Sequence, residues 1–149
     1  MVLSVRRKRR DSGATLIEFA FVVTTLMTVI FGTVDLGRAA YSYGWVSSAA
    51  RQATRFAMVR GNNCSGLSGG CPAQASDVTT YVQSLAVAID TSQLTVTSGC
   101  YFGTTYVSAL PCTAPNSVQV QVQYTLKFLS PIIYRSWTMQ STSQRTVQN

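Results

Sequence analysis

Glu18 is the residue whose type and position are most suggestive of chemistry, because it is the only glutamate among 149 residues. It lies five residues after Gly13, near the start of an apolar run over residues 14–34, and a basic cluster occupies residues 6–10. A carboxylate inside a membrane-length apolar segment costs at least about 2–3 kcal/mol and by default indicates function. The alternative is a carboxylate that rests at the membrane interface, near the basic cluster.

Other reactive groups are scarce. The chain has no histidine, and its only carboxylates after residue 13 besides Glu18 are Asp35, Asp77 and Asp90. General acid–base catalysis, metal ligation and Ser-His-Asp chemistry therefore lack most of their usual groups. The glycine-rich stretch 66–70 is not followed by the Lys-Ser/Thr of a phosphate loop. We expect no enzyme, no metal and no cofactor.

The four cysteines, Cys64, Cys71, Cys100 and Cys112, all follow the apolar run. Their spacings are not the C-x2-C of a zinc site, and without histidine only a four-thiolate site would remain. Two disulfides in an oxidising compartment are the favoured interpretation, and buried free thiols are the alternative. Three pairings are possible; the local one, Cys64 with Cys71 and Cys100 with Cys112, is the one that we expect.

The net charge of +7 belongs mostly to the start of the chain. Residues 1–13 carry five basic side chains and Asp11, which gives +4 and leaves +3 on the rest. The later basic residues are scattered, apart from Arg51, Arg55 and Arg60 on one expected helix. We interpret Arg51 and Arg55 as part of a solvated helix face. A nucleic-acid surface would need basic residues clustered with aromatic partners, so we expect no nucleic-acid binding.

The elements that position these residues begin with the apolar run. As a helix, residues 14–34 would be about 31 Å long, enough to cross the core of a bilayer. The basic flank predicts a cytoplasmic N-terminus and places the cysteines outside. Threonines inside the run can bond back to helix carbonyls. The rival interpretation is a secretory signal peptide cleaved near Ala39 or Ala40, but the apolar run is long for one.

The helix is expected to continue beyond the membrane to Arg60 and to stop at residues 61–63. A narrow face of mostly small residues recurs at steps of four and three: Ala39, Tyr43, Val46, Ala50, Ala53 and Ala57. Gly32, Gly37 and Gly44 are points where this helix could bend. Asp35 and Arg38 can form an i,i+3 pair at the membrane edge, which is worth little where exposed.

Residues 61–149 are expected to form a small outer domain. A second helix is predicted from a Ser76 cap, with Asp77 in its first turn, to about Asp90. Residues 94–97 and 105–110 are candidate strands, and the unbroken alternation over residues 118–128 predicts the strongest strand, ended by Pro131. Residues 137–147 are its expected antiparallel partner, and we expect Tyr81 and Trp137 to pack in the core. The predicted fold class is α+β, a long N-terminal helix packed on a small antiparallel sheet with a second helix.

Three stretches resemble the TadE-like family, minor pseudopilins of tight-adherence (Flp-type) pilus systems. GATLIEFA at residues 13–20 is similar to the family's processing site and helix start. DLGRAAY at residues 35–41, with Asp35, Gly37 and Arg38, is similar to its membrane-exit motif. AARQATRFA at residues 49–57 is similar to its small-residue and arginine helix. Phe19 stands where major Flp pilins have tyrosine, and the outer domain is far larger than theirs, which favours a minor subunit.

The resemblance implies a pilin-like fold in four parts. These are a leader at residues 1–13, a transmembrane helix at 14–34, its extracytoplasmic continuation at 35–60 and an extracytoplasmic α+β domain at 61–149. It implies a single-pass protein of the inner (cytoplasmic) membrane, cut between Gly13 and Ala14 by a prepilin peptidase. It also implies assembly into, or at the base of, a surface pilus that serves adherence. Implied partners are that peptidase, other pilins and pseudopilins, the inner-membrane assembly platform and the lipid bilayer.

The implied cleavage gives Glu18 a role, because it would create a new ammonium group at Ala14, one helical turn away on the same face. In an assembly, the carboxylate of one subunit could pair with the ammonium of its neighbour and set the axial register. Gly13 and Glu18 are then recognition elements, with Phe19 beside them, and no residue is catalytic. The alternative function is an unprocessed single-span envelope protein with a disulfide-bonded outer binding domain.

Overall fold

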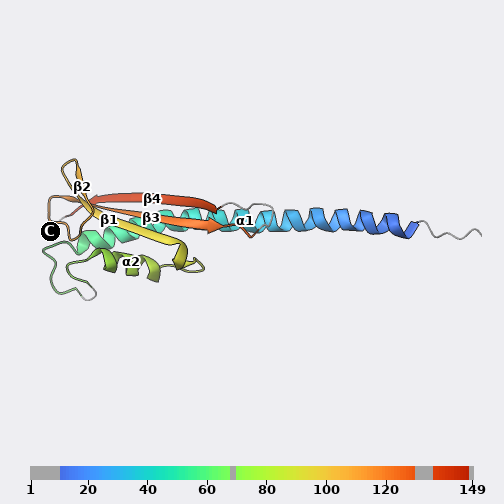
Figure 1. The fold of residues 1–149 in the computed structure, drawn as a ribbon. Coiled ribbons are helices and arrows are strands. Elements are labelled where there is room, and N and C mark those ends of the chain that lie inside the picture. The colour runs from blue at the N-terminus through green and yellow to red at the C-terminus, as the bar shows by residue number, and fades with distance from the viewer. Residues whose placement is uncertain (1–10, 68–69, 130–135, 148–149) are drawn as a thin grey trace, which may run out of the picture.

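The computed structural model describes residues 11–67, 70–129 and 136–147. Its helices are α1 (Asp11–Val59) and α2 (Ala75–Ser84), followed by a short 3-10 turn, η1 (Thr91–Gln93). Its strands are β1 (Leu94–Phe102), β2 (Thr105–Val107), β3 (Ser117–Lys127) and β4 (Ser136–Thr146). One half of α1 projects as a free rod, and the other half lies along the sheet with α2 beside it (Figure 1). The predicted α+β class is confirmed.

Helix α1 is a single helix of 49 residues, or about 74 Å, and none of the three glycines at which it could bend interrupts it. It begins three residues before the expected start and ends one residue before the expected end. Just after the helix, packing at Gly61 leaves no room for a side chain, since an added Cβ would lie 2.9 Å from Val147 Cγ1 and 3.0 Å from the carbonyl oxygen of Cys112. The next residue, Asn62, donates its backbone N–H to that carbonyl at 3.0 Å.

The outer half of α1 buries a face of small residues against the sheet. Its buried residues are Ala39, Ser42, Val46, Ala49, Ala50, Ala53, Thr54 and Ala57. Small side chains allow the strand backbone to come close, and the Thr54 hydroxyl lies 3.1 Å from the carbonyl oxygen of Ser143 on β4. The prediction for Tyr43 is wrong, because its side chain is exposed and Ser42 takes that place in the buried face.

The sheet is antiparallel, with strand order β2-β1-β3-β4. In β3 the even-numbered residues from Val118 to Leu126 are buried, as the alternation predicted, and the odd-numbered ones face outward. On the outer face, Gln121 and Gln123 each donate from Nε2 to Gln140 Oε1 at 3.2 Å. Strand β4 lies where it was predicted and pairs with β3 along its whole length. Pro131, expected to end β3, lies outside the described residues.

Strand β1 is longer than predicted, since it continues past Thr97 to Phe102. Gly99 makes this possible. A Cβ at that position would lie 2.5 Å from the carbonyl oxygen of Val107 and 2.7 Å from the ring of Tyr106. Glycine therefore lets β2 close over β1, and Tyr106 packs beside Tyr101 with ring centroids 5.2 Å apart.

The bounds predicted for α2 are wrong at both ends. Its N-cap is Gln74, whose backbone N–H donates to Asp77 Oδ2 at 2.9 Å, so Asp77 does sit in the first turn but Ser76 is not the cap. The helix ends at Ser84 because α1 captures the following carbonyls. Trp45 Nε1 donates to the oxygen of Leu85 at 3.1 Å, and the Tyr41 hydroxyl donates to that of Val87 at 2.8 Å.

The turn η1 follows α2 and is capped by Asp90. Ser92 donates to Asp90 Oδ1 from its hydroxyl at 2.7 Å and from its backbone N–H at 3.0 Å. These hydrogen bonds lower the pKa of Asp90 below its usual value of 3.8. The Asp90 carboxylate therefore keeps its negative charge to a lower pH than an ordinary aspartate does.

The two aromatic residues expected in the core differ. Tyr81 is half-buried and stacks on Phe56 with ring centroids 4.4 Å apart. Trp137, at the start of β4, is instead 59% exposed. Its register partner is Leu126, which is buried. In the described sheet, only the pair Lys127–Ser136 lies beyond Trp137.

Candidate functional site

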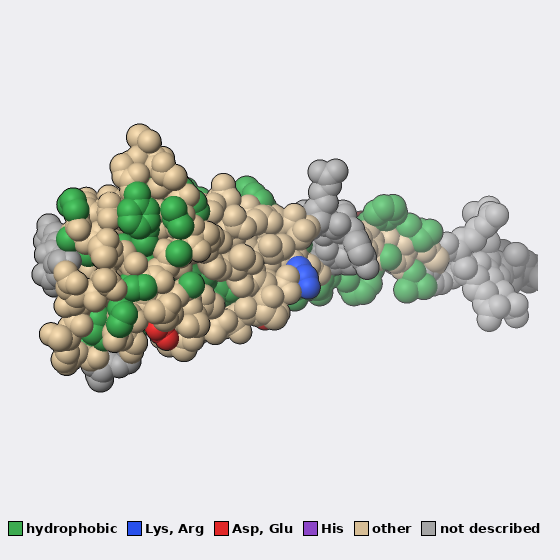
Figure 2. All heavy atoms as spheres, turned by 60° about the vertical axis from the view of Figure 1, so that its left-hand side comes forward, with side chains coloured by type: hydrophobic (Ala, Val, Ile, Leu, Met, Phe, Trp, Pro, Cys, Tyr) green, Lys and Arg blue, Asp and Glu red, His purple; other side chains and the backbone are tan. Residues whose placement is uncertain are grey.

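The free half of α1 carries apolar side chains on every face. All residues from 13 to 31 except Val23 are exposed, and the most apolar window of the helix is 0% buried. Figure 2 shows these side chains continuing along the helix where it leaves the domain, whereas the visible face of the domain carries few charged groups. In the part of the chain that the structure describes, α1 is the one helix long and apolar enough to cross a membrane.

Polar groups inside this apolar segment are satisfied within the helix. The hydroxyls of Thr24, Thr25 and Thr28 each donate to the carbonyl four residues earlier, at 2.7–2.9 Å. The Thr33 hydroxyl lies 2.8 Å from the carbonyl oxygen of Ile30. This confirms the expected back-bonding and means that the threonines bring no unpaired polar group into an apolar environment.

Glu18 differs from those threonines. Within the described residues it has no hydrogen-bond or ion-pair partner, and it is exposed, as are Gly13, Ala14 and Phe19. Ala14 and Glu18 are four residues apart, so they lie on one face of the helix. The Gly13–Ala14 bond lies in the first turn of α1, where helix ends fray and where glycine weakens the helix by about 1 kcal/mol. The basic cluster at residues 6–10 lies outside the described residues.

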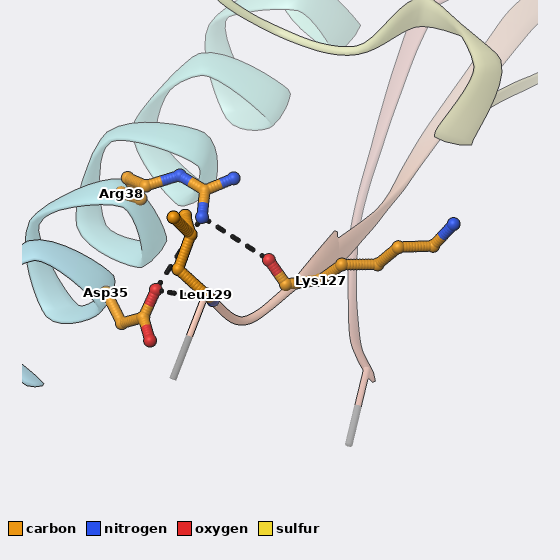
Figure 3. Close-up of polar contacts among 4 residues, drawn as sticks. All are labelled: Asp35, Arg38, Lys127 and Leu129. Carbon is orange, nitrogen blue, oxygen red and sulfur yellow. Dashed lines mark hydrogen bonds and ion pairs between the residues drawn. The ribbon is translucent and has the colours of Figure 1, made fainter. Parts of the chain in front are cut away.

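The residues expected to form a membrane-exit motif lie at a junction between helix and sheet. Asp35 is only 4% exposed, and its Oδ1 accepts the backbone N–H of Leu129 at 3.0 Å (Figure 3). Arg38 Nη1 lies 3.6 Å from the same oxygen and 3.4 Å from the carbonyl oxygen of Lys127. We name Asp35, Arg38 and the backbone of Lys127 and Leu129 the exit junction. Gly37 lies on the same segment, but a Cβ there would meet nothing within 4 Å.

The i,i+3 pair expected from the sequence is therefore present, but it is part of a larger arrangement. An isolated surface pair would contribute little, whereas a buried carboxylate that accepts a backbone N–H is a strong, charge-assisted interaction. Sequence analysis missed Lys127 and Leu129 because they contribute backbone atoms from about 90 positions away. The only available signal was that Asp35 stands at the end of an apolar run.

The four cysteines form the disulfides Cys64–Cys71 and Cys100–Cys112, which is the local pairing that the sequence favours. The second is buried and joins β1 to the segment that precedes β3. Its neighbourhood also fastens the end of α1, since the carbonyl of Cys112 accepts the N–H of Asn62. The disulfides therefore hold the end of the domain that is remote from the free half of α1.

Arg51 and Arg55 are exposed, as the interpretation of a solvated helix face requires. Together with Arg145 of β4 they line an open groove of about 610 Å³. Gln52, Met58, Gln144 and Thr146 complete its lining. None of the lining residues carries a carboxylate, and Arg51 donates to the hydroxyl of Ser47 at 3.0 Å. The groove is basic, and sequence analysis missed it because Arg145 is distant in the chain.

The described residues contain no group of three or more His, Cys, Asp or Glu side chains that could hold a metal ion. What the arrangement defines is an α+β protein built on the outer half of a helix whose inner half could span a membrane. Among the described residues it combines an exposed apolar rod, the Glu18 carboxylate, which has no partner there, and a polar junction where the rod enters the domain.

Comparison with known families agrees with this class. A family model described as TadE-like protein matches residues 13–55, which include the unpaired carboxylate, the exit junction residues of α1 and two of the groove arginines. The match confirms the resemblance over that segment and indicates involvement in the tight-adherence (Tad) pilus system, together with other pilus components. The family is associated with pili and is not an enzyme family. No curated protein and no solved structure gives a significant match to this chain.

Proposed function

We propose that this chain is a minor pseudopilin of a tight-adherence pilus, cut between Gly13 and Ala14 by a prepilin peptidase and then assembled through the free half of α1. The observation that carries the proposal is Glu18, a carboxylate with no partner in the described part of the chain, on a helix segment exposed and apolar all round. A plain membrane anchor has no use for a group that costs at least about 2–3 kcal/mol to insert.

Cleavage would supply the missing partner. It creates an ammonium group on Ala14, one helical turn from Glu18. Packed against a neighbouring span, the carboxylate of one subunit can meet the ammonium of the next, and the pair offsets the desolvation of both charges. A pair of this kind also fixes how far one helix is shifted along the other, because an axial slip of one turn, about 5 Å, separates the charges.

The rest of the chain is consistent with an outer position. The basic residues that precede α1 favour a cytoplasmic N-terminus, and the two disulfides suit an oxidising compartment. The protein is then a single-pass protein of the inner membrane with its α+β domain outside. It is a substrate of the peptidase, which supplies the catalytic groups, and it is handed on by the assembly platform to other pilins.

Retention of the span is favoured over its removal as a signal peptide. Ala39, beside the rival cleavage position, is buried under the sheet in the middle of a continuous helix. Cleavage there would also separate Asp35 and Arg38 from the domain that they hold. A peptidase acting near the frayed start of α1 meets neither obstacle.

The test is the N-terminus of protein recovered from membranes. We expect the wild-type chain to begin at Ala14, and we expect Gly13→Leu to retain the leader. Gly32→Leu is the matched control, because both glycines are helical and an added Cβ would meet nothing within 4 Å at either position, so its processing should be normal. A mature chain that begins near Ala39 or Ala40, or one that keeps Met1 while assembly proceeds, would refute the proposal.

The basic groove favours one second candidate, an unprocessed single-span envelope protein whose outer domain binds a partner. Three guanidinium groups from two elements around one open groove could hold an anionic group. The same N-terminal measurement separates the two functions, because this candidate requires the leader to remain on the chain in the wild-type cell.

A further inference from the structure

The end of the domain that faces the free half of α1 is unusually apolar. Half of the exposed large apolar side chains lie within residues 16–34, and a further group stands just beyond them. It consists of Leu36 on α1, Leu129 after β3 and Trp137 at the start of β4, which are 72%, 59% and 59% exposed. We name these three residues the membrane-end rim. They come from three separate segments, so a single amphipathic pattern does not account for them.

The exit junction fixes the height of this rim along α1. Leu129 N lies 3.0 Å from Asp35 Oδ1, and the carbonyl oxygen of the nearby Lys127 lies 3.4 Å from Arg38 Nη1. Trp137 is paired in register with Leu126, next to that carbonyl. The rim is therefore level with the stretch of α1 from Asp35 to about Arg38.

That height corresponds to the headgroup layer of a bilayer. If residues 14–34 occupy the hydrocarbon core, Arg38 lies about 6 Å beyond its edge, at about 1.5 Å of rise per residue. The headgroup region on each side of the core is about 5–7 Å thick. Leu129 and Trp137 cannot then stand clear of the membrane, because the junction holds their end of the sheet against this part of the helix.

The chemistry of the rim suits that layer. Tryptophan has an apolar body and one N–H donor, and it concentrates at membrane interfaces. The Trp137 indole N–H has no acceptor among the described residues, whereas the N–H of Trp45, the other tryptophan, donates to the carbonyl of Leu85. Lys127 is exposed beside the rim, and its ammonium group points away from the helix (Figure 3). It also lies close enough to Asp90 for its charge to help lower the pKa of that carboxyl.

We propose that the outer domain docks on the phospholipid surface through the membrane-end rim, with Trp137 and Leu129 in the boundary between headgroups and acyl chains. This rests on the single span of the proposed function, but it requires neither cleavage at Gly13 nor a role in a pilus. The outer domain would thus contact the bilayer surface before assembly, with its orientation fixed relative to the membrane.

The two tryptophans provide the test. The full chain is reconstituted in phosphatidylcholine vesicles whose acyl chains carry bromine, a contact quencher of indole fluorescence, close to the headgroup. Trp45→Phe leaves Trp137 as the only tryptophan, and Trp137→Phe leaves Trp45. We expect Trp137 to lose most of its emission relative to unbrominated vesicles, and to lose less when the bromine is near the chain ends. Trp45 should keep its emission in both.

Flotation of the same vesicles separates the two claims. Protein that floats and resists alkaline extraction while Trp137 stays bright would overturn the docking and leave the span intact; the rim would then face a neighbouring subunit. Equal quenching of both tryptophans would also overturn it, because the domain would lie on its side. Protein that does not float would contradict the span itself. If Trp45→Phe fails to fold, the difference in quenching between wild type and Trp137→Phe reports Trp137.

Discussion

Replacing Asp35 by alanine should loosen the outer domain from the helix that carries it. The carboxylate is buried and accepts the N–H of Leu129, and a hydrogen bond to a charged group contributes about 1.5–3 kcal/mol. Its pair with Arg38 adds less, about 0.2–1 kcal/mol, because the arginine side chain is 39% exposed and therefore screened. Together these terms predict a loss of roughly 2–4 kcal/mol in the free energy of unfolding.

The assay is thermal unfolding of the full chain in detergent, followed by the fluorescence of the half-buried Trp45. For a domain of this size the loss corresponds to a fall of roughly 5–15 °C in the melting temperature. Asp35→Asn is the matched variant, because it keeps an oxygen acceptor for Leu129 and loses only the charge, so we expect about half the effect. Hydrogen exchange at the Leu129 amide reports on this hydrogen bond directly. We expect it to be fast in Asp35→Ala and slower in both Asp35→Asn and the wild type.

The reasoning would be refuted by an Asp35→Ala protein that melts within about 1 °C of the wild type, the size expected for an ordinary surface substitution. It would equally be refuted if the melting temperature fell while the Leu129 amide remained protected, because the loss would then have another origin.

Three further predictions concern separate parts of the chain. Glu18→Gln should leave membrane insertion and cleavage largely intact but reduce filament yield, measured on sheared pili and on a gel of the mature chain; a normal yield would show that the charge is not needed. Gly99→Ala should destabilise the domain by about 1–3 kcal/mol, because its Cβ would overlap Val107 and Tyr106 of the neighbouring strand β2. Gly44→Ala, in an open helical position, should be neutral or stabilising by up to about 1 kcal/mol. Equal effects of the two variants in thermal melts would contradict this. Replacing both Cys100 and Cys112 by serine should cost about 2–4 kcal/mol, and peptides of the unreduced protein should carry the two local disulfides, so freely alkylated thiols in envelope-purified protein would count against both statements.

The sequence was sufficient where a strong period governs the chain. The alternation of β3 specified its buried face because one side of that strand packs on α1 and the other meets water. The small-residue period of α1 likewise predicted the face that the sheet covers. It failed at Tyr43, because a helical stripe is wide enough to run through either of two neighbouring positions, and the smaller Ser42 fits under the sheet.

The remaining errors have tertiary causes. The end of α2 depends on two aromatic side chains of α1 that capture its carbonyls, which local sequence does not encode. The extension of β1 past Thr97 depends on pairing with β3 on one side and β2 on the other, which the short local alternation does not encode. The exit junction and the basic groove each join residues about 90 positions apart in the chain. The sequence therefore indicated the residues on α1 but not the partners that β3 and β4 bring to them.

The continuity of α1 has a mechanical consequence. One unbroken helix forms both the exposed apolar rod and the spine of the outer domain, and the sheet stiffens its outer half along much of its length. The exit junction closes the place where a hinge would otherwise form. A push or twist applied near Glu18 is therefore delivered to the disulfide-bonded end about 60–70 Å away without being absorbed in a flexible linker. Because the outer domain is packed rigidly on the same helix that forms the span, a displacement of the span by a few ångströms moves the whole outer domain by the same amount.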